Sequence, residues 1–250
     1  MRFENKVAIV TGASRGIGKV AAVALAREGA RVVVAARTEE ASQLPGTIHE
    51  TVREIEALGG KALAVRTDVS DEASVDEMVR CTLEAFGRID VLVNNAAVAF
   101  YPPVVETPPR RWDLVLRVNI RGPFLCSRAV LPRMIEQRSG SIVNLSSKAA
   151  DINGPTYVGV AYCTAKAAVE RFSNALAEEV KQYNIAVNAI KPRQEVSTEG
   201  MRFWNPKADW SRWDKPEDFL VKGILFLAGQ DARLTGQVVV DKELCRRYKL

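Results

Sequence analysis

Residues 6–18 read K-V-A-I-V-T-G-A-S-R-G-I-G, and this stretch decides the fold. The run Lys6–Thr11 is short, apolar and rich in β-branched residues, which is typical of a buried strand. A glycine-rich turn follows, and Gly16–Glu28 then has the pattern of a helix that ends at Gly29. A strand that passes through such a turn into a helix predicts the first unit of a doubly wound α/β sheet.

The same alternation of strand and helix continues along the rest of the chain. Further strands are predicted at Arg31–Ala36, Ala62–Arg66, Val91–Asn94, Ser141–Leu145, Ile185–Ile190 and Gln237–Val240. Further helices are predicted at Thr51–Leu58, Ser70–Phe86 (with Ser70 as N-cap), Arg110–Arg138, Tyr162–Tyr183 and Pro216–Ala228. Apolar strands separated by helices imply a parallel sheet that is covered on both faces. We therefore expect an α/β fold, a doubly wound parallel sheet of about seven strands with helices on both faces (a Rossmann fold). Residues 1–250 are expected to form a single domain.

The composition is that of a globular protein with little affinity for nucleic acid. Apolar residues make up 47% of the 250 residues, and the net charge of +5 is modest. Basic residues are interspersed with acidic ones, apart from the short tail Arg246–Lys249, which we interpret as a solvated end. Because the chain has no apolar run of about 18 residues and enters a strand almost at once, we expect neither a membrane span nor a signal peptide. The sequence predicts a cytoplasmic protein.

Cysteine and histidine usage narrows the possible chemistry. The four cysteines form no C-x-x-C pair, and His49 is the only histidine. One histidine and four dispersed cysteines make both a zinc-dependent mechanism and a Ser-His-Asp hydrolase improbable. We therefore expect no metal site.

The glycine loop Thr11–Gly18 predicts a dinucleotide site. Gly12, Gly16 and Gly18 allow a tight turn and a close approach of the backbone to a pyrophosphate at the positive end of the following helix. The position of the loop between the first strand and the first helix strengthens this interpretation.

The end of the second strand indicates which nicotinamide cofactor is used. NAD sites place an acidic residue there, whereas NADP sites need positive charge for the 2′-phosphate. This chain has Ala35-Ala36-Arg37 at that point and Arg15 inside the glycine loop. Two guanidinium groups can converge on one phosphate, so we predict NADP(H). The alternative interpretation is a pair of solvated surface arginines.

Tyr162 and Lys166, in the run A-Y-C-T-A-K, are the candidate reacting pair. Four residues apart on a helix, they leave from the same face. A free tyrosine has a pKa of about 10, and a neighbouring ammonium favours the phenolate and lowers that pKa. The phenol then becomes a usable proton donor and acceptor. Because such pairs are common by chance, the interpretation depends on the other motifs.

Together these motifs resemble the short-chain dehydrogenase/reductase family, in the compact form that has about the length of this chain. The resemblance covers nearly the whole sequence. Beside the glycine loop and Tyr162/Lys166, the motifs found in family order are Asp68-Val69, Asn94-Asn95-Ala96, Asn119, Ser146-Ser147 and Pro192.

The resemblance implies a role for each of these residues. Tyr162 is expected to exchange a proton with a carbonyl or alcohol oxygen, and Ser147 to hydrogen-bond the same oxygen. Lys166 is expected to lower the tyrosine pKa and to hold the cofactor ribose. Asn119 is expected to anchor a proton-relay water, or to serve as a polar helix residue bonded to a backbone carbonyl, and both roles can coexist. Cofactor contacts are implied for Gly12, Ser14, Arg15, Gly16, Ile17, Gly18, Arg37, Asp68, Val69, Asn95, Ala96, Ala97, Tyr162, Lys166 and Pro192.

Several residues depart from the family pattern without removing a catalytic group. Ala97 and Arg193 stand where glycine is usual, and the chain has Val240-Asp241-Lys242 in place of the usual Asp-Gly-Gly. The Pro-Arg pair at 192–193 and the insertion Thr38–His49 point towards the hydroxysteroid-dehydrogenase-like branch.

On the substrate side of the site we expect a lid at Gln194–Asp214. It contains Phe203, Trp204, Trp210 and Trp213. These rings can fold over a bulky hydrophobic ketone or alcohol, or they can pack the lid against the body or a neighbouring subunit.

We therefore expect an NADP(H)-dependent oxidoreductase that interconverts a ketone and a secondary alcohol. One alternative is a 3-oxoacyl-thioester (acyl-carrier-protein) reductase, which a basic patch formed by Arg110, Arg111 and Arg193 would support. Another is a non-catalytic NADP sensor. The resemblance also implies a dimer or tetramer joined through the helices that carry Asn119 and Tyr162. Ala165, Ala168, Val169 and Phe172 give the second of these helices a large apolar surface, and we predict a homotetramer.

Overall fold

Seven parallel strands run through the centre of the computed structural model, which describes residues 1–40 and 43–250. The strands are β1 (Val7–Thr11), β2 (Arg31–Ala36), β3 (Lys61–Arg66), β4 (Val91–Asn94), β5 (Gly140–Leu145), β6 (Ile185–Lys191) and β7 (Val238–Val240). Their order in the sheet is β3-β2-β1-β4-β5-β6-β7. The expected doubly wound sheet is thereby confirmed, and the order in which the strands are added to it reverses between β1 and β4. Part of the insertion Thr38–His49, at 41–42, lies outside the described residues.

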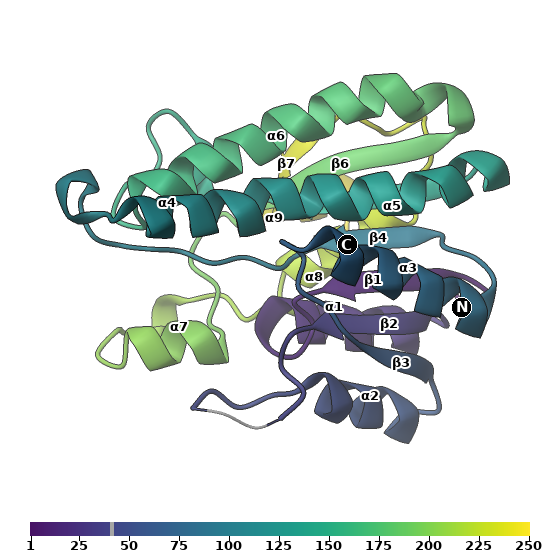
Figure 1. The fold of residues 1–250 in the computed structure, drawn as a ribbon. Helices are drawn as coiled ribbons and strands as arrows, with labels where there is room; N and C mark the ends of the chain where they lie inside the picture. The colour runs from purple at the N-terminus through teal and green to yellow at the C-terminus, as the bar shows by residue number, and fades with distance from the viewer. Residues whose placement is uncertain (41–42) are drawn as a thin grey trace.

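Helices cover both faces of this sheet (Figure 1). They are α1 (Gly16–Arg27), α2 (Ile48–Ala57), α3 (Glu72–Phe86), α4 (Pro109–Leu116), α5 (Gly122–Gln137), α6 (Val160–Val180), α7 (Glu199–Trp204), α8 (Leu220–Ala228) and α9 (Asp241–Tyr248). Helices α1, α2 and α8 pack on one face, and α3, α5 and α6 pack on the other.

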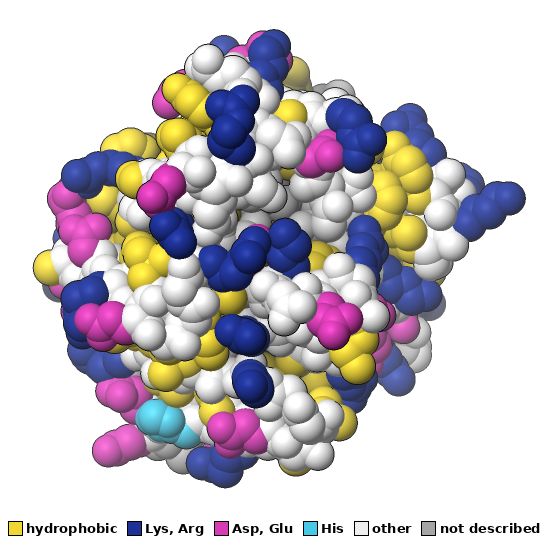
Figure 2. Space-filling model, turned by 90° about the vertical axis from the view of Figure 1, so that its right-hand side faces the viewer, with side chains coloured by type: hydrophobic (Ala, Val, Ile, Leu, Met, Phe, Trp, Pro, Cys, Tyr) yellow, Lys and Arg dark blue, Asp and Glu magenta, His cyan; other side chains and the backbone are white. Residues whose placement is uncertain are grey.

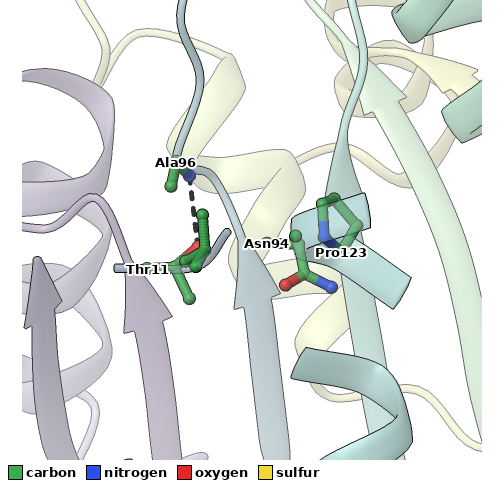
Figure 3. Close-up of a pocket in the computed structure, with 6 residues that line it drawn as sticks. Thr11, Asn94, Ala96 and Pro123 are labelled. Atoms are coloured by element: carbon green, nitrogen blue, oxygen red, sulfur yellow. Dashed lines mark hydrogen bonds between the residues drawn. The ribbon is translucent and has the colours of Figure 1, made fainter. Parts of the chain in front are cut away.

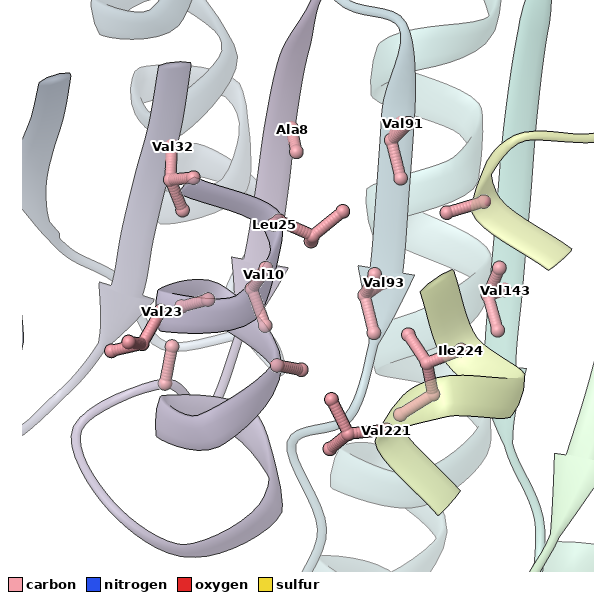
Figure 4. Close-up of a cluster of buried hydrophobic side chains, with 14 of the residues drawn as sticks. Ala8, Val10, Val23, Leu25, Val32, Val91, Val93, Val143, Val221 and Ile224 are labelled. Carbon is pink, nitrogen blue, oxygen red and sulfur yellow. The ribbon is translucent and has the colours of Figure 1, made fainter. Parts of the chain in front are cut away.

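The two faces follow from the alternation of side chains along each strand. In β1, Ala8 and Val10 point to the face that carries α1 and α8, whereas Ile9 points to the opposite face. Figure 4 shows the first of these clusters, in which Leu25 of α1 and Ile224 of α8 meet side chains of the central strands. Each such side chain contributes about 1.5–3 kcal/mol by leaving water, so the apolar strands hold the sheet between its helices.

Some element ends differ from the sequence predictions for local reasons. Asp71, not Ser70, caps α3, because its carboxylate accepts the Ala73 N–H at 3.2 Å. Ser70 is engaged instead with Asp68, to which its N–H donates at 2.9 Å and its hydroxyl at 2.8 Å. The predicted long helix Arg110–Arg138 is divided into α4 and α5 by a π-helical turn at Arg117–Arg121.

Two helices were not predicted at all. One is α7 in the expected lid, and the other is α9, whose last turn holds most of the basic tail 246–249, and these tail residues are exposed, as expected of a solvated end. Tyr248 in that turn stacks on Phe226 of α8, with ring centroids 4.3 Å apart.

The surface carries both signs of charge. Figure 2 shows a row of Lys and Arg side chains across one face, with Asp and Glu on both sides of it. Within the described part of the chain, no helix is long and apolar enough to cross a bilayer.

Candidate active site

The candidate site lies at the carboxyl ends of β1 and β4, where the strand order reverses. In open α/β sheets this switch point is where ligands bind. A narrow hollow lies here (Figure 3). It is lined by Thr11, Val69, Asn94, Ala96, Gly122 and Pro123. The Thr11 hydroxyl ties β1 to the end of β4, because it accepts the N–H groups of Asn95 at 3.0 Å and Ala96 at 3.1 Å.

The glycine loop has the conformation and the close contacts that require glycine. Gly12 and Gly16 have positive φ angles of 66° and 57°. A Cβ atom on Gly18 would lie 2.4 Å from Asn95 Nδ2 and 2.5 Å from Gly12 O. Asn95 fixes the loop from β4, since its amide donates to Thr11 O at 2.8 Å and to Gly12 O at 3.2 Å. This tight turn at a helix N-terminus fits the pyrophosphate of a nicotinamide cofactor.

The N-terminus of α1 receives a carboxylate from the expected lid. Arg15 at the N-cap makes no side-chain cap, and the Gly16 N–H donates to Glu199 Oε2 at 3.0 Å. A negative group is stabilised at the positive end of a helix, so Glu199 ties α7 to the glycine loop. The sequence prediction did not include this residue.

The structure gives Arg15 and Arg37 separate partners. Arg15 donates to the carbonyl oxygens of Pro45 at 2.8 Å and Gly46 at 2.9 Å. Arg37 is half exposed and lies 3.8 Å from the Asp68 carboxylate. Burial raises the pKa of Asp68, but hydrogen bonds from Ser70 and the charge of Arg37 outweigh this and hold that pKa below its usual value. The two guanidiniums therefore do not share a partner in this structure.

The other expected cofactor contacts lie around the same loop and cleft. Ser14 is buried, and Ile17 packs against the core beneath α1. Val69 faces Gly122, where a Cβ atom would come within 2.9 Å of its side chain. Ala97 is exposed just beyond β4.

Helix α6 places Tyr162 and Lys166 together near its start. A Cβ atom on Gly159, the N-cap, would lie 1.9 Å from Phe100 O, so the helix can begin here only with glycine. Lys166 Nζ lies 5.5 Å from the centroid of the Tyr162 ring. Lys166 is only 3% exposed and donates to Leu145 O at the end of β5 at 2.6 Å. The pair thus joins α6 to the carboxyl end of the sheet.

The electrostatics of this pair differ from the simple expectation. Burial raises the pKa of the Tyr162 phenol to about 12, and a hydrogen bond from Ser147 acts in the opposite direction. Burial also lowers the pKa of Lys166 to about 8. Burial thus outweighs the lowering of the tyrosine pKa that was expected from the ammonium, and Lys166 donates to a backbone carbonyl and lies over the ring.

Ser147 and Asn119 flank the pair from two directions. The Ser147 oxygen accepts the Ala149 N–H at 3.2 Å, which leaves its proton available for the Tyr162 oxygen. Asn119 is fully buried in the π-helical turn. Its amide donates to the carbonyls of Val98 at 2.7 Å and Val115 at 2.9 Å. Asn119 therefore has one of its two expected roles, that of a polar helix residue bonded to backbone carbonyls.

Pro192 follows β6 directly, and Arg193 turns away towards α9. The Arg193 N–H donates to Asp241 Oδ1 at 2.8 Å, and its guanidinium lies 3.8 Å from Glu243. The backbone after Pro192 is thus anchored through Asp241, which takes over a position where the family has glycine.

The expected lid Gln194–Asp214 is closed at its base. Ser197 N–H donates to Asp214 O at 2.8 Å, and Asp214 N–H donates to Glu195 O at 3.1 Å. Trp210 and Trp213 pack on each other with ring centroids 4.7 Å apart. The tyrosine at 157 reaches the lid, since its hydroxyl donates to Glu195 Oε1 at 2.8 Å.

Two buried polar networks near the site were missed by the sequence analysis. In one, Asn94 donates to Asn144 at 2.8 Å and Asn144 donates to Ser173 of α6 at 2.8 Å. The other joins Ser146, Glu170, Lys191 and Asp151. The available signal was the presence of Asn144 and Lys191 in strands that are otherwise apolar. Among the described residues, no group of three or more His, Cys, Asp or Glu side chains is placed to hold a metal ion.

The parallel sheet, with its glycine loop at the point where the strand order reverses, defines a protein of the doubly wound α/β class. A family model described as short chain dehydrogenase matches residues 6–208, so the chain belongs to the short-chain dehydrogenase family. The resemblance inferred from the sequence is thereby confirmed.

Known relatives give the range of proteins to which this chain is similar. It is 36% identical over 240 residues to hydroxysteroid dehydrogenase-like protein 2 of Danio rerio, a match that covers 95% of this chain and 57% of that protein. The chain thus spans a little over half the length of that curated relative. It is 37% identical over 241 residues to the 3-oxoacyl-[acyl-carrier-protein] reductase of Synechocystis sp., with 93% of each chain covered.

A solved structure matches over almost the whole chain. The crystal structure of a metagenomic short-chain oxidoreductase in complex with NADP is 32% identical, has a TM-score of 0.80, and matches 96% of this chain and 97% of that one.

Proposed function

We propose that this chain is an NADP(H)-dependent oxidoreductase that interconverts a ketone and a secondary alcohol, acting as a single domain. The observation that carries the proposal is the grouping of Tyr162, Ser147 and Lys166 at the carboxyl end of the sheet, the end that also carries the glycine loop. A nucleotide sensor on the same fold needs the loop but not these three side chains.

The proposed roles follow from the chemistry of each group. With a pKa of about 12, the Tyr162 phenol is protonated at neutral pH and can donate its proton to a carbonyl oxygen. The Ser147 hydroxyl donates a hydrogen bond to the same oxygen and stabilises the charge that develops there. Lys166 orients the cofactor ribose, and Asn119 holds the backbone around Val98 that borders the site. The nicotinamide ring supplies or accepts the hydride when the cofactor is bound.

Several features support NADP(H) as the cofactor. The tip of β2 carries Arg37 and no acid, and a structural relative with 32% identity was crystallised with NADP. We propose that Arg37 exchanges its contact with Asp68 for the 2′-phosphate. Arg15, which is held by two carbonyl oxygens, acts from the glycine loop. The remaining contacts come from the glycine loop and its neighbours, as the family resemblance implies.

The lid supports a bulky hydrophobic substrate as part of the proposal. Phe203 is 44% exposed, and Trp210 and Trp213 form a tilted ring pair in the same segment. Aromatic rings of this kind provide a large apolar surface for a cyclic or aromatic ketone.

A second candidate is a 3-oxoacyl-thioester reductase. The specific observation in its favour is the match to the Synechocystis reductase, which covers 93% of both chains. The basic residues Arg110 and Arg111 of α4 would then face an acidic carrier protein. Arg193 contributes less to this patch, because it lies towards Glu243.

Hydride transfer, followed by nicotinamide absorbance, tests the proposal. NADPH and NADH are compared with a panel of bulky cyclic and aromatic ketones and a β-ketoacyl thioester. We expect turnover with NADPH on at least one ketone, and a loss of about hundredfold or more in Tyr162→Phe, since that variant has no proton to donate. Tight NADPH binding without turnover would favour the sensor, and unchanged activity in Tyr162→Phe would contradict the assigned role.

We also propose that the chain forms a homo-oligomer through α5 and α6. Phe124 near the start of α5 and Val160 at the start of α6 are 46% and 45% exposed. Of the residues first expected on this surface, Ala165 and Val169 are buried within the chain's own core, so only the remaining part of α6 is available.

A further inference from the structure

A buried lysine beside the candidate active site has no role in the proposed chemistry. Lys191 is the last residue of β6, directly before Pro192, and its side chain is only 8% exposed. Its Nζ donates to Glu170 Oε1 of α6 at 3.0 Å and to Asp151 Oδ1. Burial lowers the pKa of Lys191, but the hydrogen bonds and charges of the two carboxylates outweigh this and raise it above its ordinary value. The group is therefore an ammonium at neutral pH.

Each partner of Lys191 belongs to a segment that positions a site residue. Glu170 lies one helical turn after Lys166 on α6 and also accepts the Ser146 hydroxyl at 2.6 Å. Ser146 is buried and directly precedes Ser147 at the end of β5.

Asp151 adds the fourth segment to this network. It directly follows the short helix Lys148–Ala150, which Ser147 caps, and begins the loop that leads to Gly159 and Tyr162. The chain Ser146–Glu170–Lys191–Asp151 thus joins the end of β5, helix α6, the end of β6 and the loop over the site.

We propose that Lys191 is a positioning residue that holds Ser147 and Tyr162 in their relative geometry by tying these four segments together. The expected effect on kcat rests on the proposed function, whereas the expected effect on the local structure does not. None of the four side chains is expected to touch substrate, so the network acts through the backbone that carries Ser147, Tyr162 and Pro192.

The energetics favour positioning over stability as the reason for such a network. A buried ion pair costs much of its attraction in desolvation, and packed apolar residues often replace it without loss of stability. Its specific benefit is a fixed arrangement of the groups it joins. Displacement of a reacting group by about 1 Å can cost up to about a hundredfold in rate.

The test compares Lys191→Met with Lys191→Arg and with a matched control, Lys6→Met. Lys6 Nζ donates to Asp90 Oδ1 at 3.1 Å, a bond of similar length at the opposite end of the sheet from the candidate site. We expect Lys191→Met to lower kcat about tenfold or more, with the dissociation constant for NADPH unchanged within about twofold. We expect Lys191→Arg to recover most of the rate, because it keeps the charge and the donors, and Lys6→Met to leave kcat unchanged.

Amide hydrogen exchange gives a readout that needs neither turnover nor cofactor. We expect faster exchange in residues 147–159 of Lys191→Met, with no such change in Lys6→Met. If Lys191→Met does not fold, Asp151→Asn replaces it, since this neutralises only the carboxylate through which the loop contacts Lys191, and Asp151 is 48% exposed. The same local exchange and a lower kcat are expected in that variant.

The outcomes separate this inference from the proposed function. Faster exchange at 147–159 in a protein whose wild type turns over no substrate would uphold the network and contradict the oxidoreductase. Unchanged kcat and unchanged local exchange in both Lys191→Met and Asp151→Asn would overturn the inference, even if melting temperatures fell, because the ion pair would then be purely structural.

Discussion

At the scale of single residues, Lys166 gives a pH dependence with a definite sign. Burial lowers its pKa to about 8, whereas an unfolded lysine has a pKa of about 10.4. Between these values the unfolded chain binds the extra proton, so the free energy of unfolding rises with pH. Below about pH 8 both states are protonated, and the cost of the buried charge is fully present.

Lys166→Met removes this titration. We expect the free energy of unfolding of the wild type, minus that of the variant, to increase by roughly 2–3 kcal/mol between pH 7 and pH 10. Urea unfolding of the cofactor-free protein across this range measures the difference. Tyr162 does not interfere, because its raised pKa of about 12 changes stability only above about pH 10. If the free energies of unfolding of the two proteins change with pH in the same way, Lys166 stays ionised over the whole range and the prediction is wrong.

The residues of the site that the sequence reveals are those with a distinctive spacing. Tyr162 and Lys166 lie one helical turn apart on α6. The structure brings Ser147, which follows β5, to the Tyr162 phenol. Glu170 and Lys191 carry no such spacing, because their contact joins α6 to β6 across the tertiary fold. A charged residue at the end of an apolar strand signals only that it needs a partner, not which partner it has.

At the scale of elements, α1 and α7 are coupled through one side chain. The Glu199 carboxylate accepts the Gly16 N–H at 3.0 Å, at the helix end where the proposed cofactor places its pyrophosphate. Two negative groups compete for the same positive helix end, so Glu199 opposes cofactor binding. Interactions of a charge with a helix terminus amount to about 0.3–1 kcal/mol at exposed sites.

Glu199→Gln is therefore expected to bind NADPH about two- to fivefold more tightly than the wild type. Titration followed by NADPH fluorescence measures this affinity without any substrate. Glu195→Gln is the matched control, since Glu195 lies in the same lid but contacts Tyr157 instead of α1. Equal affinities in the wild type and both variants would mean that the Glu199 contact is not in competition with the cofactor.

The order of elements was predictable, but several of their ends were not. All seven predicted strands, whose pattern is largely apolar, are present in their order along the chain. Helix α9 was missed because residues 241–248 are mostly charged, and its apolar contacts come from a few side chains, among them Leu244 in the core and Tyr248 against Phe226. The division at Arg117–Arg121 was equally hidden, because Asn119 satisfies backbone groups of Val98 that are remote in sequence.

At the scale of the whole molecule, the exposed apolar surface near the starts of α5 and α6 predicts self-association. Phe124 is 46% exposed and Val160 is 45% exposed, while most large apolar side chains of these helices are buried. Aromatic side chains are enriched at the buried centre of protein interfaces. A stable interface needs about 800 Å² from each partner, so the predicted contact extends over both helices.

We expect the purified protein to have a molar mass of two or four chains by light scattering coupled to size-exclusion chromatography. A carboxylate at the centre of such an interface is buried without a partner, so Phe124→Asp is expected to shift the distribution towards the monomer. Leu58→Asp is the matched control, because Leu58 is 50% exposed at the end of α2, and α2 packs on the face of the sheet opposite to α5 and α6. A monomeric wild type would contradict the prediction, and equal dissociation in both variants would show that the contact lies elsewhere.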